Sequence, residues 1–354
     1  MSDMNKNKEP AMTKQMNFFD LSNHYEKLSS QGDPLERLLK VMDFKIFLPL
    51  LEKAFAKERK STAGRKAFDL LLMFKILIIQ SLYNLSDAQT EYQIKDRLSF
   101  LRFLGLPLGD VVPDEKTIGL YRETLKTTQM LDKLFQRFEN YLADQGFIAK
   151  LGHIVDASLV EAPKQRNSRA ENAEIKTGKC PRSWEENPAK KRQKDCEARW
   201  TIKSGKTYYG YKTHINIDVK HKLIRAYQVT AANSGDKAQL NTLLAAVPHN
   251  AQEVWADGAY FSEKQEQHLK ANHYRSYIIN RTKKFPLHSL IGRENSRRSK
   301  IRKRVEHVFG FMQNSMKGKF IRCIGLARAT LKIGLMNLVY NVCRYEQLTR
   351  LGVG

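Results

Sequence analysis

Residues 152–158 read GHIVDAS and residues 253–259 read EVWADGA, two short apolar runs that each end on an aspartate followed by a small residue. These aspartates are Asp156 and Asp257. A carboxylate at the end of a buried strand is costly to desolvate unless it is hydrogen-bonded, paired or bound to a cation. Either aspartate alone could be a turn residue, but the two together suggest a shared cation.

A third acid lies in a strongly basic, helix-like segment near the C-terminus. Glu306 follows seven lysines and arginines between residues 293 and 304, which only Glu294 opposes. Arg302 lies one turn before Glu306, so these two could instead form an ordinary exposed ion pair. The segment also carries an apolar stripe at helical spacing, which predicts a helix lying on a sheet with Glu306 beside the stripe: Ile301, Val305, Val308, Met312 and Met316.

Two aspartates and a glutamate can serve the cleavage of a phosphodiester bond. That reaction needs a nucleophile in line with the leaving oxygen, and positive charge on both oxygens in the transition state. Two magnesium ions roughly 4 Å apart supply this charge and prefer carboxylate oxygens as ligands. In this interpretation Asp156 bridges both ions, while Asp257 and Glu306 each hold one side.

Composition points to a polyanionic partner. The chain of 354 residues has 61 Lys and Arg against 37 Asp and Glu, a net charge of +24. Such a chain binds phosphate backbones through counterion release, so binding should weaken as salt rises. The longest apolar stretch, 70–83, is too short to span a bilayer and predicts a buried core helix, so no membrane partner is expected. Residues 1–33 lack an apolar signal core, which predicts a cytoplasmic protein.

Cysteine spacing argues against a structural zinc site. Cys180 and Cys196 lie 16 positions apart, Cys323 and Cys343 lie 20 apart, and no Cys-x-x-Cys pair occurs. We expect reduced, unpaired thiols.

The N-terminal part of the chain has helical periodicity. Residues 1–33 are predicted to be a disordered tail, and residues 34–146 an all-helical domain in which Ser86 and Asp114 begin helices as polar caps. A basic break at 62–66 contains Arg65 and Lys66, which could contact phosphate or lie in a solvated loop.

After residue 147 the pattern changes to short β-rich runs separated by helices. Helices are predicted from Asp236 and from Ser262, and the order β, ββ, α, β, α, β, α implies a mixed α/β sheet. Residues 164–206 read as a charged insertion or mobile loop anchored by Trp184 and Trp200. The runs expected to be strands are 154–160, 208–219, 223–230, 254–256 and 276–280.

Other polar residues allow a functional and a simpler interpretation. Lys212 and His214 alternate with apolar residues on a predicted strand and could face DNA, or lie on a half-exposed strand face. Asp236 is expected to be a helix cap rather than a metal ligand.

In this order, the features resemble a known family, the DDE transposases of bacterial insertion sequences, in the branch named after insertion sequence five. The likeness runs from about residue 34 to residue 348. Its features are Gly64-Arg65-Lys66, Tyr83-Asn84-Leu85-Ser86-Asp87, Pro113-Asp114-Glu115-Lys116-Thr117-Ile118, Tyr121-Arg122, Val155-Asp156-Ala157-Ser158, Tyr209-Gly210-Tyr211-Lys212, Trp255-Ala256-Asp257-Gly258-Ala259-Tyr260 and Arg302-Lys303-Arg304-Val305-Glu306.

The resemblance implies a ribonuclease-H-like catalytic domain, residues 147–354, preceded by a helical DNA-binding domain, residues 34–146. It implies that Asp156, Asp257 and Glu306 are the catalytic acids and ligands of Mg2+, for which Mn2+ may substitute. It also matches Arg302 to the arginine four positions before the glutamate, while Ser299 and Gln313 stand where a related branch has tyrosine and lysine. The residues expected to bind DNA are Arg302, Lys303, Arg304, Arg298, Lys212, Arg65 and Lys66.

These observations lead to the hypothesis of a bacterial, nucleoid-associated transposase. It would bind the terminal inverted repeats of its element, cleave double-stranded DNA and join the ends to target DNA, as a homodimer or larger assembly. The alternatives are a nuclease or resolvase of the same fold that does not join strands, and a non-catalytic DNA-binding derivative.

Overall fold

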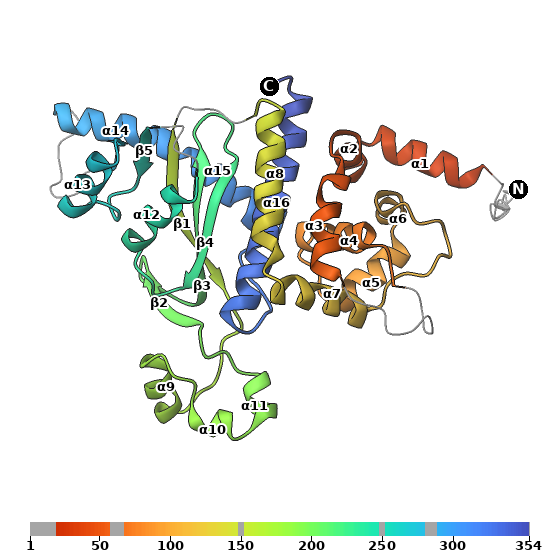
Figure 1. The fold of residues 1–354 in the computed structure, drawn as a ribbon, viewed down its shortest axis with the longest axis horizontal. Helices are drawn as coiled ribbons and strands as arrows, with labels where there is room; N and C mark the ends of the chain where they lie inside the picture. Colours follow the sequence, from red (N-terminus) through yellow and green to blue (C-terminus); the bar gives the residue numbers. More distant parts are fainter. Residues whose placement is uncertain (1–18, 57–66, 148–151, 248–251, 280–288, 354) are drawn as a thin grey trace, which may run out of the picture.

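A computed structural model describes residues 19–56, 67–147, 152–247, 252–279 and 289–353. In Figure 1 a β-sheet with its flanking helices forms one half of the molecule, and short N-terminal helices form the other. The long helices α8 (Met130–Asp144) and α16 (Leu326–Arg350) lie between the two halves. The mixed sheet with flanking helices that the sequence predicts is therefore confirmed.

The helices before the sheet begin where polar caps were predicted. Ser86 forms a capping box with Gln89, and the Asp114 carboxylate accepts a hydrogen bond from the backbone N–H of Thr117. Both predicted helix starts are confirmed. The helices are α1 (Asp20–Ser30), α2 (Pro34–Val41), η1 (Phe44–Phe47), α3 (Leu48–Phe55), α4 (Leu70–Leu82), α5 (Asp87–Asp96), α6 (Leu98–Leu104), α7 (Glu115–Thr127) and α8.

The predicted core helix is α4, which Asp69 caps and whose middle residues are buried. Within the described ranges, no single helix has the length and apolar character to cross a membrane, although α4 and α5 taken together, bent by 103°, meet those two criteria. Most of α4 packs instead against α16, α3, α6 and α7.

Part of the segment predicted to be a disordered tail is helical. Helix α1 occupies residues 20–30 of that segment. Tertiary contacts stabilise it, because Arg102 donates hydrogen bonds to the Tyr25 carbonyl and the Ser29 hydroxyl and lies over the Tyr25 ring. The polar composition of residues 1–33 does not reveal these contacts.

Six strands of the described chain form one mixed sheet. They are β1 (His153–Glu161), β2 (Arg199–Lys203), β3 (Lys206–Asp218), β4 (Ile224–Ala231), β5 (Glu253–Ala256) and β6 (Arg275–Ser276). The order is β2-β3-β1-β5-β6, and β4 pairs with β3. Strand β1 is antiparallel to β3 and parallel to β5, which places β1 at the centre of the sheet.

Five of the six strands match predicted apolar runs, although β6 is much shorter than its run. The missed strand is β2, which pairs with the start of β3. A two-residue turn joins these strands, with Ser204 at φ 50° and Gly205 at φ 75°. A pair of left-handed residues is typical of a tight hairpin, so the Ser-Gly dipeptide was the sequence signal for this strand.

The glycine in the Tyr-Gly-Tyr-Lys segment has a packing reason. Gly210 pairs with Glu161 of β1 on one side and with Arg199 of β2 on the other. Its φ is +148°, and an added Cβ would lie 2.4 Å from the Val160 carbonyl oxygen. Only glycine fits this close approach without moving the backbone of β1.

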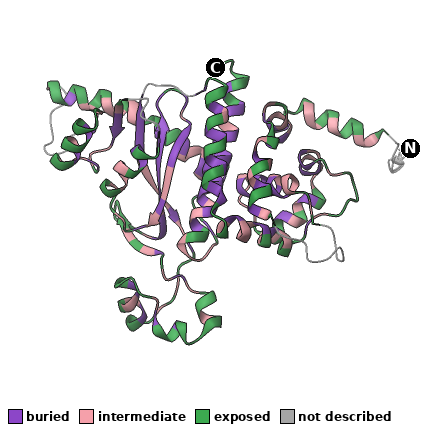
Figure 2. Cartoon of the chain, viewed as in Figure 1, coloured by how far each residue is buried: buried purple, intermediate pink, exposed green. Residues whose placement is uncertain are grey.

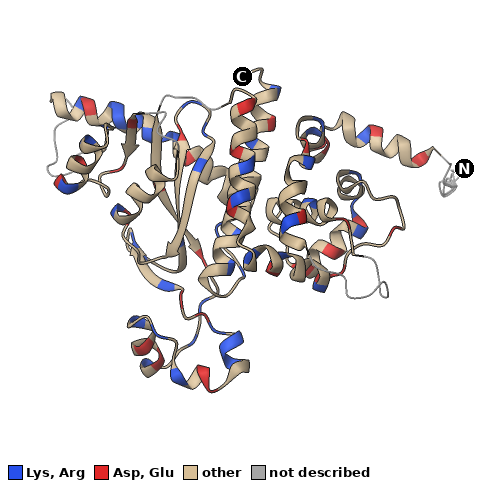
Figure 3. Ribbon diagram, in the orientation of Figure 1, with Lys and Arg blue, Asp and Glu red and all other residues tan. Residues whose placement is uncertain are grey.

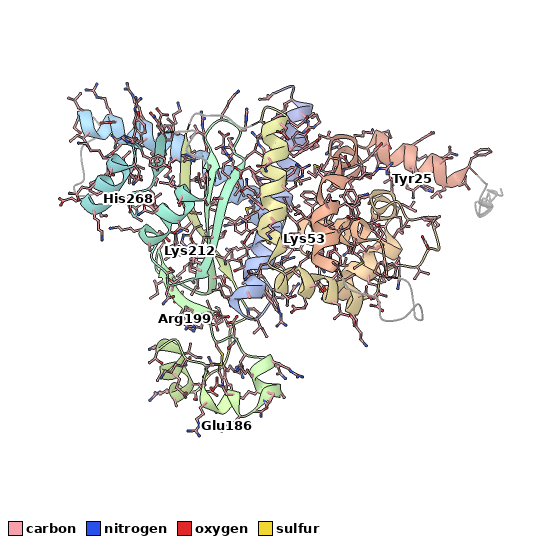
Figure 4. All side chains as sticks on the ribbon, viewed as in Figure 1. Tyr25, Lys53, Glu186, Arg199, Lys212 and His268 are labelled. Carbon is pink, nitrogen blue, oxygen red and sulfur yellow. A yellow bond between two sulfur atoms is a disulfide. The ribbon has the colours of Figure 1, made fainter. Side chains whose placement is uncertain are left out.

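The charged insertion is a small ordered lobe, below the sheet in Figure 1 and marked by Glu186 in Figure 4. It contains α9 (Arg169–Lys176), α10 (Arg182–Glu185) and α11 (Pro188–Arg192). The indole of Trp184 is fully buried and donates to Glu171, whereas Trp200 is 47% exposed and contacts the Tyr209 ring at a tilt of 46°. Trp184 is therefore a buried anchor and Trp200 is not.

The prediction of four reduced cysteines is wrong for two of them. Cys180 and Cys196 form a disulfide within the lobe, because the chain folds back through α10 and α11 and brings their Cα atoms to 5.3 Å. Cys323 and Cys343 are free, as predicted.

The remaining helices cover the sheet. The predicted helices after Asp236 and Ser262 are confirmed as α12 and α13. The bounds are α12 (Lys237–Ala245), α13 (Glu263–Ala271), α14 (Leu290–Arg302), α15 (Arg304–Gly310) and the π-helical turn η2 (Phe311–Ser315).

Helix α16 joins the two halves of the molecule. It contacts β4 on one side and α4, α8 and α2 on the other. One continuous core cluster contains Phe74 of α4, Phe138 of α8, Ile215 of β3 and Leu338 of α16. Figure 2 shows buried residues on the sheet and on the helices at either side of α16. The domain boundary at residue 147 stays a prediction, because the core does not divide there.

Candidate active site

The two aspartates that end apolar runs lie at neighbouring positions of adjacent strands. Strands β1 and β5 are parallel, with Val155 opposite Ala256, so Asp156 and Asp257 are the next residues along each strand. Asp257 directly follows the last residue of β5, whereas Asp156 is the fourth residue of β1, which continues to Glu161. Because the two strands are parallel and paired up to these positions, both carboxylates lie in one region. Asp156 accepts from the Ala157 N–H and Asp257 from the Ala259 N–H, each at 2.8 Å.

Glu306 reaches this region from α15. Of the predicted apolar stripe, Val305, Val308, Met312 and Met316 are buried and Ile301 is partly buried against the same core. This stripe packs α15 against β1 and leaves Glu306 on the exposed side, within reach of Arg302.

Arg302 links two of the three acids. Its guanidinium donates to Asp156 Oδ2 and to Glu306 Oε1, each at 2.6 Å. The side chains of Arg302 and Asp156 are 16% exposed, whereas that of Glu306 is 56% exposed. The Arg302–Asp156 pair is therefore the more strongly shielded from water. The exposed ion pair between Arg302 and Glu306 that the sequence suggested is present, but Arg302 also pairs with Asp156.

The electrostatics of the site reflect the burial of Asp156. Burial, with a smaller contribution from the nearby Asp257 charge, raises the pKa of Asp156 to about 6, although Arg302 and the Ala157 N–H oppose this rise. Lys203 of β2 also lies close enough to lower this pKa. A buried carboxylate with an acidic neighbour is favourable only beside positive charge, which here comes mainly from Arg302.

The donor set fits a hard divalent cation, but the side chains are not arranged around one. Three carboxylates are the oxygen ligands that Mg2+ prefers. Among the described residues, no group of three His, Cys, Asp or Glu side chains is positioned to hold a metal ion. The Arg302 guanidinium lies between Asp156 and Glu306, where a shared cation would bind.

Two family models match the chain. The model for a transposase DDE domain matches residues 147–342, and the model for a transposase domain of the DUF772 class matches residues 23–124. The chain belongs to the DDE transposases. The first match covers the whole sheet and most of α16, so this sheet is the ribonuclease-H-like core of the family. No solved structure matches the chain.

The family gives the transposase its general chemistry. It acts in DNA transposition as the enzyme of a transposable element, its substrate is DNA, and enzymes of this family use divalent metal ions. The three acids discussed above all lie inside the matched DDE range.

Several residues predicted to bind DNA have protein partners in the transposase. Arg298 donates to the Ile278 carbonyl and to Glu294, and Arg304 donates to the Val219 carbonyl. Lys303 is exposed at the junction of α14 and α15. Arg65 and Lys66 lie outside the described residues.

Strand β3 places Lys212 and His214 differently from the DNA-facing interpretation. The Lys212 ammonium bonds Asp236 Oδ1 and the Ser234 carbonyl, each at 2.8 Å (Figure 4). His214 is fully buried and bonds Thr230, so it cannot contact DNA. Burial lowers the pKa of His214 to about 4, which keeps its ring neutral. Asp236 precedes α12 as predicted, but its side chain caps no N–H and pairs with Lys212 instead.

Sequence reasoning missed Tyr260 as part of the site. Tyr260 follows Asp257 by three residues and is 1% exposed, and its hydroxyl has no hydrogen-bond partner among the described residues. Burial raises its pKa, and the charges of Asp156, Asp236 and Asp257 raise it further. The hydroxyl thus lies near three carboxylates. The position of Tyr260 in the Trp-Ala-Asp-Gly-Ala-Tyr segment, three residues after Asp257, was the sequence feature that could have predicted its place in the site.

Proposed function

We propose that this transposase, of the branch named after insertion sequence five, binds the terminal inverted repeats of its own element. It cleaves the strands there and joins the freed 3′-hydroxyls to target DNA. Because two ends must be held together, it works as a dimer or larger assembly, in the bacterial cytoplasm and associated with the nucleoid.

One observation carries this proposal: Asp156 of β1 and Asp257, which directly follows β5, lie at neighbouring positions of two adjacent parallel strands, and Arg302 ties Glu306 to Asp156. The three acids come from residues far apart in sequence, and the fold brings them to one region. This convergence, and the position of the three acids in the DDE range, support their proposed roles as catalytic acids and metal ligands.

Mg2+ is the proposed cofactor, with Mn2+ as a substitute. When bound, it supplies positive charge to the attacking and leaving oxygens of an in-line displacement. In cleavage a water oxygen bonds to phosphorus while the bond between phosphorus and the 3′-oxygen breaks. The water gives up a proton, and the leaving 3′-oxygen takes up a proton to become the 3′-hydroxyl. In joining, the 3′-hydroxyl attacks a target phosphodiester in the same way. Asp156, Asp257 and Glu306 would hold the cation, and the hydrophobic packing of α15 fixes the position of the helix that carries Glu306.

Exposed cations beside the acids provide a path for the DNA backbone. Arg297, Lys300 and Lys303 are exposed on α14 and at its end, immediately before Glu306. Figure 3 shows Lys and Arg recurring along this helix. Contacts of this kind position the backbone and weaken as salt rises.

The test uses the inverted repeats that flank the gene. Duplexes with these ends are incubated with the protein, a plasmid and Mg2+, and the expected result is joined end–plasmid product. Nicking without joining would support a nuclease or resolvase, and binding without nicking would support a non-catalytic derivative.

Replacing Arg302 with Met should tighten binding of a divalent cation to the free protein by about tenfold. In the wild type a cation must displace two charge-assisted hydrogen bonds of the guanidinium, whereas in Arg302→Met it meets two uncompensated carboxylates. Calorimetric titration with Mn2+ measures the affinity. Arg297→Met, on the exposed face of the same helix, is the control and should bind Mn2+ as the wild type does. Equal or weaker binding by Arg302→Met would show that the guanidinium does not occupy the cation's place.

A further inference from the structure

A cavity of about 730 Å3 lies between the N-terminal helices and the start of α16, away from the acids. Its walls come from the α4–α5 turn, from α7 and from residues 322–332. Asn84 fixes one wall, because its amide donates to the carbonyls of Lys317 and Phe320. The cavity is thus built by residues from both family-matched regions of the chain.

The charge of this cavity is strongly positive. Five Lys and Arg side chains line it, against two carboxylates. Both carboxylates are already paired, since Asp87 bonds Arg122 and Glu123 bonds Arg328. Three cations remain for which no carboxylate partner exists within the described parts of the chain: Lys116, Arg322 and Lys332.

These three cations are arranged from the mouth to the interior. Lys116 and Arg322 are exposed, whereas Lys332 is partly buried on α16. Burial, together with the neighbouring Arg122 charge, lowers the pKa of Lys332 to about 8. An anion bound in the cavity would favour the charged form of Lys332 and so raise its pKa again. Leu85, Leu120 and Leu331 also line it, and their apolar surface reduces the screening of such a contact by water.

We propose that this cavity binds a backbone phosphate of the DNA substrate, held by Lys116, Arg322 and Lys332. This inference rests on the proposed function, because it extends the DNA path of the same enzyme. Phosphate oxygens accept hydrogen bonds from lysine and arginine, and a mouth with two exposed cations admits a strand rather than enclosing a free ion.

The position of the cavity favours a strand that also reaches the acids. Within β1, Asp156 lies five residues before Glu161, which pairs with Phe320 beside the cavity wall. Five residues of strand span about 17 Å, close to the rise of about five base pairs. One DNA end could therefore contact both the acids and this cavity, and so bridge the two halves of the chain.

The test compares DNA binding by three variants and a control, all measured without divalent metal. Lys332→Met removes the interior charge but keeps an unbranched side chain, and the double variant adds Arg322→Met. We expect the double variant to bind a labelled duplex about tenfold more weakly, and its slope of log K against log salt to fall by one to two. Lys332→Arg should restore most of the affinity. The control is Lys133→Met, which removes an exposed charge on α8 away from the cavity. It should weaken DNA binding only by the small amount expected from the loss of one distant charge.

Competition with inorganic phosphate identifies the source of the ligand. Phosphate should raise the Tm of the wild type, and added duplex should remove this response. If phosphate stabilises the wild type but Lys332→Met and the double variant bind DNA normally, the cavity is a free-anion site and the proposal is wrong. Unchanged affinity and salt slope in a folded double variant would also overturn it.

The outcomes separate this inference from the proposed function. If the double variant binds normally while the wild type cuts and joins element ends, only the cavity assignment fails. If the wild type joins no ends but the salt slope still falls in the variants, only the transposition proposal fails.

Discussion

Replacing Asp156 with Asn is expected to abolish metal-dependent strand cleavage, by at least about a thousandfold, while DNA binding stays close to wild type. Asparagine keeps the shape of the side chain but loses the charge that would hold a cation. Asp156 is the central acid, since it neighbours Asp257 across the strands and bonds Arg302. A thousandfold loss corresponds to about 4 kcal/mol of barrier. Nicking of an end-containing plasmid in Mg2+ measures it.

The control for this experiment is Glu263→Gln, which neutralises an exposed acid at the start of α13, six residues after Asp257. This variant should cleave at the wild-type rate, because it removes the same charge outside the site. DNA affinity is measured for both variants in the absence of metal. Cleavage that persists in Asp156→Asn would show that the three acids are not the catalytic set.

Local sequence patterns predicted the elements that carry the site. Alternating and continuous apolar runs located β1, β3, β4 and β5. A buried strand needs apolar side chains whichever strand it pairs with, so its sequence shows the pattern without knowledge of the partner. The stripe from Val305 to Met316 correctly predicted that α15 lies on the sheet. Polar caps at Ser86 and Asp114 correctly marked helix starts, since capping depends only on nearby backbone groups.

Contacts between distant residues were not predictable in the same way. The Arg302–Asp156 pair joins residues 146 positions apart, and the sequence suggested only the local pair with Glu306. Lys212 was predicted to face DNA, but its partner Asp236 lies on another element. The cavity beside α16 is lined by residues 80–123 and 322–332, which lie far apart in the sequence. No local sequence pattern indicates that these two segments come into contact.

The second large effect concerns the connection between α8 and the sheet. Arg225 of β4 donates to Glu139 of α8 at 2.5 Å, and both side chains are only 4% exposed. Burial raises the pKa of Glu139, although Arg225 lowers it. Arg225→Met should reduce the free energy of unfolding by about 3–5 kcal/mol, because it leaves a buried carboxylate without its cation. Urea denaturation followed by circular dichroism measures the change.

A second substitution separates an unpaired charge from lost packing. Adding Glu139→Leu to Arg225→Met should restore most of the stability, since two apolar side chains can replace a buried ion pair at little cost. The matched control is Arg328→Met, which breaks the Arg328–Glu123 pair between α16 and α7. Those side chains are 49% and 34% exposed, so its loss should cost no more than about 1 kcal/mol. Equal losses in Arg225→Met and the double variant would assign the effect to packing, and the buried pair would then not be what joins α8 to β4.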